Sequence, residues 1–146
     1  MTSREIRPGN LKQAVPFFGI MNIDASLAFY VDGLGFAIKY RWEPDGRIRW
    51  CWLERDGVGL MLQEYVKDGH HGGPPVGTLG LGMSVCIMCE DAIAIYHEAR
   101  ARGLSPQRPY VGNNLWVTSF LDPDGYHVDF ESPTDAPEES VYTDPA

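Results

Sequence analysis

The chain alternates short apolar runs with polar turns, and the period of these runs predicts one order of elements twice. Apolar residues repeating every second position indicate strands, whereas a 3.6-residue period between a capping residue and a glycine indicates a helix. The first half therefore reads as a strand, a helix and three strands, over residues 13–23, 26–33, 36–42, 47–53 and 58–65. The second half repeats this order over residues 79–88, 90–102, 107–111, 116–121 and 126–131.

The two halves also correspond at their helices, where Asp24–Tyr30 matches Glu90–Tyr96 and a glycine follows each helix. A repeat of this kind decides the fold. We predict an α+β protein in which duplicated βαβββ modules form a curved mixed sheet around a cleft. One domain would span residues 1–146, with module one at about 13–66, a linker at 67–78 and module two at about 79–133. The tail, 134–146, is expected to be loosely ordered.

The last hairpin carries the most informative pattern. Asp122–Gly125 has the composition of a tight turn, in which proline fixes φ and glycine allows positive φ. Because side chains alternate along a strand, the next residues divide between two faces. One face carries Tyr126, Val128 and Phe130, and the other carries His127, Asp129 and Glu131. We expect the polar face to line the cleft, although a solvated sheet surface would show the same alternation.

Composition narrows the class of partner. The net charge of −8 disfavours nucleic acid and favours cations. No apolar run is long enough for a membrane span, so no membrane partner is expected. Three cysteines cannot form a full disulfide framework, and a reducing cytoplasm is the expected compartment. Cys86 and Cys89 point to opposite faces of a strand, so we interpret them as buried structural thiols.

Aromatic residues are concentrated on one hairpin, which holds Trp42, Trp50 and Trp52. Trp50 and Trp52 share a face. Two interpretations remain open: packing in the core or at a dimer interface, or an aromatic wall for a flat or cationic ligand. Residues that would extend such a wall are Phe17, Met61, Tyr110 and Tyr126. The Gly/Pro-rich linker holds His70 and His71, which fit a solvated loop or the border of a cleft.

With these motifs together, the chain resembles the vicinal oxygen chelate superfamily, which includes glyoxalase I, extradiol dioxygenases and bleomycin-resistance proteins. The resemblance spans about residues 13–133 and rests on the order and spacing of four short segments: 26–30, 34–36, 91–103 and 122–125. Metalloenzymes of this superfamily hold a divalent metal with one side chain from the first and one from the last strand of each module. Counting from the motifs places these positions on Phe17, Met61 (or Gln63), Ser84 and Asp129.

Only Asp129 of this set is a good metal ligand. The resemblance is therefore to the metal-free bleomycin-resistance branch, whose members sequester a drug without catalysis, in a groove at a homodimer interface. We expect no metal, no other cofactor and no catalytic residue, and a homodimer that binds a small, aromatic and cationic molecule. Asp129, with Glu131 or Glu64 nearby, would supply charge. The expected ligand-binding residues are Phe17, Trp50, Trp52, Met61, Ser84, Tyr110, Trp116 and Asp129.

Two other function classes stay open. One is a divergent lyase or isomerase that uses His127 and Asp129 as acid and base, for which metal content is the discriminating observation. The other is an interaction module that has the fold but no ligand-sized cavity.

Overall fold

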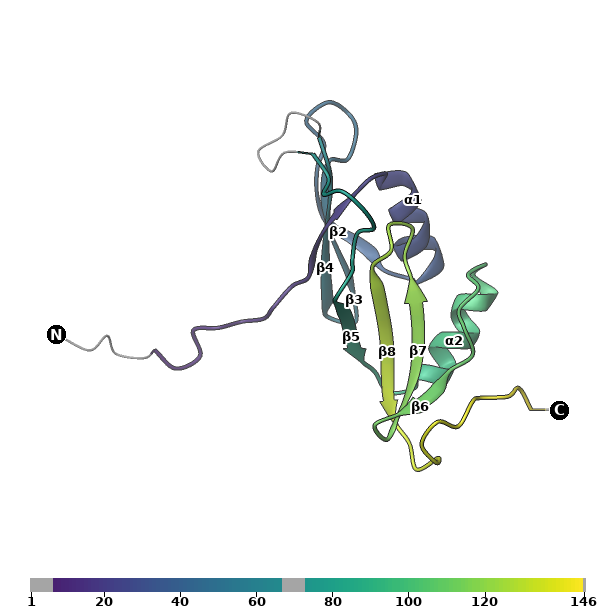
Figure 1. Ribbon diagram of the computed structural model, residues 1–146. Helices are drawn as coiled ribbons and strands as arrows, with labels where there is room; N and C mark the ends of the chain where they lie inside the picture. The colour runs from purple at the N-terminus through teal and green to yellow at the C-terminus, as the bar shows by residue number, and fades with distance from the viewer. Residues whose placement is uncertain (1–6, 67–72, 146) are drawn as a thin grey trace.

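A computed structural model of the chain, which describes residues 7–66 and 73–145, has two four-stranded sheets (Figure 1). Sheet A contains, in spatial order, β1 (Phe17–Ile20), β4 (Val58–Glu64), β3 (Trp50–Arg55) and β2 (Ala37–Trp42). Sheet B contains β5 (Ser84–Met88), β8 (His127–Pro133), β7 (Leu115–Leu121) and β6 (Tyr110–Gly112). β1 pairs in parallel with β4, and β5 pairs in parallel with β8. All other strand pairs in the two sheets are antiparallel. The predicted α+β fold with a duplicated module is confirmed.

Each module contributes one helical region. The first consists of α1 (Ile23–Leu27), which continues as a π-helical segment, η1 (Ala28–Gly33), and the second is α2 (Ala92–Ala101). The first helix begins earlier than predicted because Asn22, in extended backbone, accepts a bond from the Ala25 amide at 3.0 Å. Asp24 and Ser26, whose side chains could also cap a helix, lie inside α1, and Ser26 is buried.

The first strand of each module is shorter than predicted. Pro16 has no N–H group to donate to a strand ladder, and Asn22 caps the following helix. β1 is therefore limited to four residues. Gly80 and Gly82 have φ of 76° and 78°, in the left-handed region and not in the strand region, and β5 therefore begins at Ser84.

One core joins the two modules. The helices lie on the same side of the sheets (Figure 1), and the alternate residues that face them are buried in a single cluster. Phe18 of β1 stacks on Tyr126 with the ring centroids 4.1 Å apart. The Tyr126 hydroxyl donates to the Gly19 carbonyl at 2.8 Å, and the Tyr30 hydroxyl donates to Asp122 Oδ2 at 2.7 Å.

Asp122 also organises the turn that leads into β8. Its Oδ1 accepts from the amides of Asp124 and Tyr126, both at 2.9 Å. Gly125 has φ of 98°, which side chains other than glycine rarely adopt, and a Cβ there would lie 2.9 Å from the Leu79 carbonyl oxygen. Both the backbone conformation and the close contact therefore require glycine. Burial and the neighbouring Asp122 carboxylate both raise the pKa of Tyr30, which keeps its hydroxyl protonated as a donor.

The two ends of the described chain differ. Part of the tail is ordered, contrary to expectation, because Val111 and Tyr142 donate backbone bonds to Ser140 and Pro109 and so cover the edge of β6.

The segment of residues 7–16 has no helix or strand and leaves the body on the side away from the helices (Figure 1). Among the described residues, no helix combines the length and apolar character needed to cross a bilayer.

Replacing Tyr30 by Phe should lower the free energy of unfolding by about 1–3 kcal/mol, because it leaves the buried Asp122 carboxylate without one donor. Urea denaturation followed by circular dichroism measures the change. Tyr40→Phe is the control, since Tyr40 is exposed. Equal midpoints for the two variants would contradict the proposed importance of this bond.

Candidate functional site

The face of sheet A that points away from the helices is aromatic and open. Strand pairing places Phe17, Met61, Trp52 and Tyr40 in one row across all four strands. The next row contains Gln63, Trp50 and Trp42. About half of the surface of Phe17, Tyr40 and Trp42 is accessible, which is unusual for side chains of this size in a small protein. We call this surface the aromatic face.

Trp52 is held flat on the aromatic face by its neighbours. A Cβ at Gly59 would lie 3.0 Å from the Trp52 indole nitrogen, so the ring packs where only glycine leaves space. Tyr40 meets Trp52 edge to face, with ring centroids 6.2 Å apart. The buried indole N–H has no acceptor among the described residues, and an unpaired buried donor costs free energy.

The corresponding face of sheet B is polar. Its rows are Ser84, His127 and Leu121; Cys86, Asp129 and Ser119; and Met88, Glu131, Val117 and Tyr110. The alternation predicted for the last strand is observed, since Val128 and Phe130 are buried while Asp129 and Glu131 are partly exposed. We call this surface the acidic face.

Asp129 is the most unusual group on the acidic face. Its Oδ1 is buried and has no hydrogen-bond partner among the described residues. No lysine, arginine or histidine in the described part of the chain forms an ion pair with Asp129 or Glu131. Buried polar atoms in proteins are nearly always paired, so this oxygen marks a place where a donor is missing.

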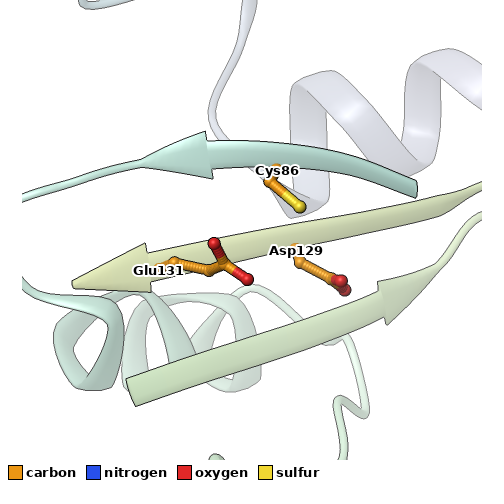
Figure 2. A group of neighbouring side chains, drawn as sticks. All are labelled: Cys86, Asp129 and Glu131. Carbon is orange, nitrogen blue, oxygen red and sulfur yellow. The ribbon is translucent and has the colours of Figure 1, made fainter. Parts of the chain in front are cut away.

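Cys86 joins these two carboxylates, which corrects the expectation of a buried structural thiol. Figure 2 shows Cys86, Asp129 and Glu131 directed toward a common point, and one ligand atom of each lies within 4.8 Å of the others. Cys86 is exposed, Cys89 is half-buried and Cys51 is buried. Desolvation, followed by the charges of Glu131 and Asp129, raises the pKa of Cys86, so its thiol is protonated at neutral pH.

Glu64 does not belong to the site, contrary to expectation. It lies at the end of β4 on the side of the helices, where its carboxylate accepts from the Ile23 amide at 2.8 Å. Arg47 and Arg49 donate to it at 2.9 and 3.0 Å. Burial opposes ionisation of Glu64, but these bonds and charges outweigh it and lower its pKa. Its charge is thus neutralised within the fold.

The remaining predicted residues lie in different parts of the molecule. Trp116 lies on the opposite side of sheet B, where it packs edge to face on Tyr142, and not beside Asp129. Ser84 is exposed at the end of the acidic face and pairs with His127, whereas the strand neighbour of Asp129 is Cys86. Tyr110, a predicted ligand-binding residue, lines a cavity of about 670 Å³. Cavities of about 460, 320 and 350 Å³ are lined by other residues. His70 and His71 lie outside the described residues.

Several residues of these faces escaped the sequence analysis. The sequence predicts strands for Tyr40 and Met88 without indicating a role for either, and it places Trp42 on the aromatic hairpin without naming it as a ligand-binding residue. It favours a structural thiol at Cys86. Their relation to Asp129 and Trp52 depends on the pairing register of strands distant in sequence. The alternation of β5 alone does place Cys86 and Met88 on one face, which was the available signal.

The superfamily's divalent metal does not fit this chain. Two of its four side-chain positions, Phe17 and Met61, are apolar in the structure as in the sequence and face the open side of sheet A. The cluster of Cys86, Asp129 and Glu131 comes from sheet B alone, so it is not the superfamily's set. We derive no metal chemistry for the site.

Comparison with known proteins shows which family and which solved structures this chain is similar to. The family model described as "Glyoxalase/Bleomycin resistance protein/Dioxygenase superfamily" matches residues 15–130. A glyoxalase/bleomycin resistance protein/dioxygenase from Nocardioides has a TM-score of 0.67 and 16% identity over 94% of this chain and 93% of its own. A bleomycin-binding protein solved with bleomycin has a TM-score of 0.64 and 22% identity over 84% of this chain and 98% of its own.

The antibiotic-binding protein TnmS3 from Streptomyces sp. CB03234 has a TM-score of 0.64 and 19% identity over 86% of this chain and 98% of its own. At these identities the likeness shows the fold. Among curated proteins, none matches this chain significantly.

We expect the purified protein to retain far less than one metal ion per chain after mild chelation, because two of the four superfamily ligand positions are apolar. Elemental analysis for Zn, Fe, Mn and Ni checks this. A value near one ion per chain would contradict it. In that case Cys86→Ser and Asp129→Asn would show whether the sheet B cluster holds the ion.

Proposed function

Since this chain belongs to the glyoxalase/bleomycin resistance protein/dioxygenase superfamily, we propose that it binds and sequesters a small, aromatic and cationic molecule without a metal. The likeness to a bleomycin-binding protein and to the antibiotic-binding TnmS3 supports a role in drug resistance. The three free cysteines favour a reducing cytoplasm as its compartment.

The unpaired Oδ1 of Asp129 is the observation that carries the proposal. A buried acceptor without a donor is costly, and a bound cation with an N–H group would remove that cost. Glu131 adds a second carboxylate on the same face, and the protein's net charge of −8 attracts cations from a distance. The acidic face therefore accounts for the cationic part of the ligand.

The aromatic face accounts for the flat part of the ligand. Trp52, Trp50 and Tyr40 offer ring surfaces, and Trp rings attract cations as well as other rings. Both faces are open in one copy, so a second copy that covers them would exclude water and complete the walls. We therefore propose a symmetric homodimer, with the ligand between the two kinds of face.

A thermal-shift screen identifies the ligand class. It would compare bleomycin, planar aromatic cations and neutral aromatic analogues of the same size, each with and without divalent metal. Ligands that bind only the folded state raise the melting temperature. We expect the cations to stabilise more than the neutral analogues, with no requirement for metal. Stabilisation only in the presence of metal would contradict the proposal.

Replacing Asp129 by Asn should weaken binding of the aromatic cation tenfold or more, about 1.5–3 kcal/mol, because the shape is kept and the local charge is lost. Affinity of the parent should also fall as salt rises. Isothermal titration calorimetry measures both. Asp32→Asn is the matched control, since Asp32 changes the net charge equally but lies on η1. Unchanged affinity in Asp129→Asn, with binding lost in Trp52→Ala, would mean that stacking alone recognises the ligand.

Light scattering at micromolar concentration should give twice the chain mass of 16.3 kDa. The reason is that an exposed aromatic face of this extent is normally covered. Trp42→Glu should shift the equilibrium to monomer, since a charge on the buried interface is costly. Leu81→Glu, at an exposed residue outside both faces, is the control. A parent with the mass of a single chain would refute the dimer.

A further inference from the structure

The acidic face holds three hydrogen-bond acceptors in a compact arrangement. One carboxylate oxygen of Asp129, one of Glu131 and the sulfur of Cys86 all lie within 4.8 Å of one another (Figure 2). Strand register places Cys86 of β5 directly beside Asp129, and Glu131 follows on the same face of β8. Two adjacent strands therefore fix the three corners, and we call this set the acceptor triangle.

The protein supplies no cation of its own to the acceptor triangle. Within residues 7–66 and 73–145, neither Asp129 nor Glu131 has an ion-pair partner, and the buried Oδ1 of Asp129 has no donor. Met88 and Val117, which flank Glu131 in its row, are apolar and offer no side-chain donor. A buried acceptor is nearly always paired, so a ligand for this place brings N–H or O–H groups with it.

The size of the acceptor triangle distinguishes between kinds of cation. A primary ammonium has three N–H donors in tetrahedral directions, and oxygens at about 2.9 Å from its nitrogen lie about 4.7 Å apart. This spacing agrees with corners that lie within 4.8 Å of one another. A guanidinium spreads its donors over three nitrogens, and acceptors bonded around it lie about 6 Å apart. A quaternary ammonium has no N–H group and suits an aromatic surface.

The same three residues are a poor match for a metal ion. A metal binds the thiolate form of cysteine, so the thiol has to lose its proton first. Desolvation and the neighbouring carboxylates raise the pKa of Cys86, which disfavours that loss at neutral pH. A protonated thiol keeps its sulfur lone pairs as a weak acceptor, which is sufficient for one corner around an ammonium.

We infer that the cationic group of the ligand is a primary ammonium, which donates its three N–H groups to Asp129, Glu131 and Cys86. The inference rests on the proposed function, which requires a cation but does not specify its kind. It assigns the ammonium to the acidic face of sheet B and leaves the aromatic face for the flat part of the ligand. Cys86 thereby becomes a ligand-binding residue, beside the two carboxylates.

A matched set of probes tests the kind of cation. Naphthylmethylammonium, its trimethylammonium analogue, the corresponding guanidinium and neutral naphthylmethanol share one ring system. In isothermal titration calorimetry we expect the primary ammonium to bind at least about tenfold tighter than the trimethylammonium, because it alone of these two gives donors to the buried acceptor. The guanidinium should also bind more weakly than the primary ammonium.

The outcomes separate the inference from the proposed function. Equal affinity for the primary ammonium and the trimethylammonium, or tightest binding of the guanidinium, would overturn the inference and leave cation binding in place. Binding of the neutral alcohol as tightly as the cations, or binding of none of the four, would overturn both.

A variant tests whether the acceptor triangle sets this preference. Glu131→Gln should lower the affinity ratio of primary ammonium to trimethylammonium about threefold or more, because one corner loses its charge. Glu90→Gln is the matched control, since Glu90 is exposed and outside the triangle and the net charge changes equally. The ratio separates donor recognition from the loss of net charge, which weakens both cations. An unchanged ratio in Glu131→Gln would contradict the inference.

Zinc competition tests the metal alternative directly. One equivalent of Zn²⁺ should leave the affinity for naphthylmethylammonium unchanged, because Cys86 stays protonated at neutral pH. Displacement of the probe by zinc, and its loss in Cys86→Ser, would show that the three residues form a metal site and would overturn the inference.

Discussion

The structure depends on a shared core that locks the two modules into one body. Phe18 stacks on Tyr126 at 4.1 Å, and the buried pair of Tyr30 and Asp122 joins the first helical region to the turn before β8. Because Asp122 also accepts from the amides of Asp124 and Tyr126, the same side chain fixes the module contact and the start of the strand that carries Asp129. The position of the acidic face is therefore set by packing on the other side of its sheet.

The two modules have the same strand order but opposite surface chemistry on their open faces. Phe17 pairs with Met61 in sheet A at the place where Cys86 pairs with Asp129 in sheet B. One duplicated fold thus provides an apolar wall and a carboxylate wall. Neither wall alone satisfies its polar groups, as the unpaired Trp52 indole nitrogen and Asp129 Oδ1 show among the described residues. The proposed ligand and second copy are the two partners that would satisfy them.

Much of the fold could be predicted from local patterns. The turn at Asp122–Gly125, the alternation after it and the duplicated order of elements depend on residues close in sequence. The start of the first helix was harder to predict, because Asn22, Asp24 and Ser26 lie close together and all have side chains that can cap a helix. The ordered tail depends on bonds to a distant strand edge, which composition does not encode.

The site was harder to predict because it depends on registers and on ion pairs between distant strands. Glu64 was expected among the ligand-binding charges, but Arg47 and Arg49 bind it on the core side. Trp116 was expected near the ligand, and strand pairing puts it beside Ser132 on the side of α2. In contrast, the alternation at Asp129 was predictable because a single strand determines it.

The distribution of tryptophans gives the protein an optical property. Three of its four tryptophans, Trp42, Trp50 and Trp52, lie on the aromatic face, and Trp116 lies apart on the far side of sheet B. Intrinsic fluorescence is therefore dominated by rings on one surface, and its emission wavelength follows the polarity at that surface. Whatever covers this surface, a bound ligand or a second copy, changes the emission without any added label.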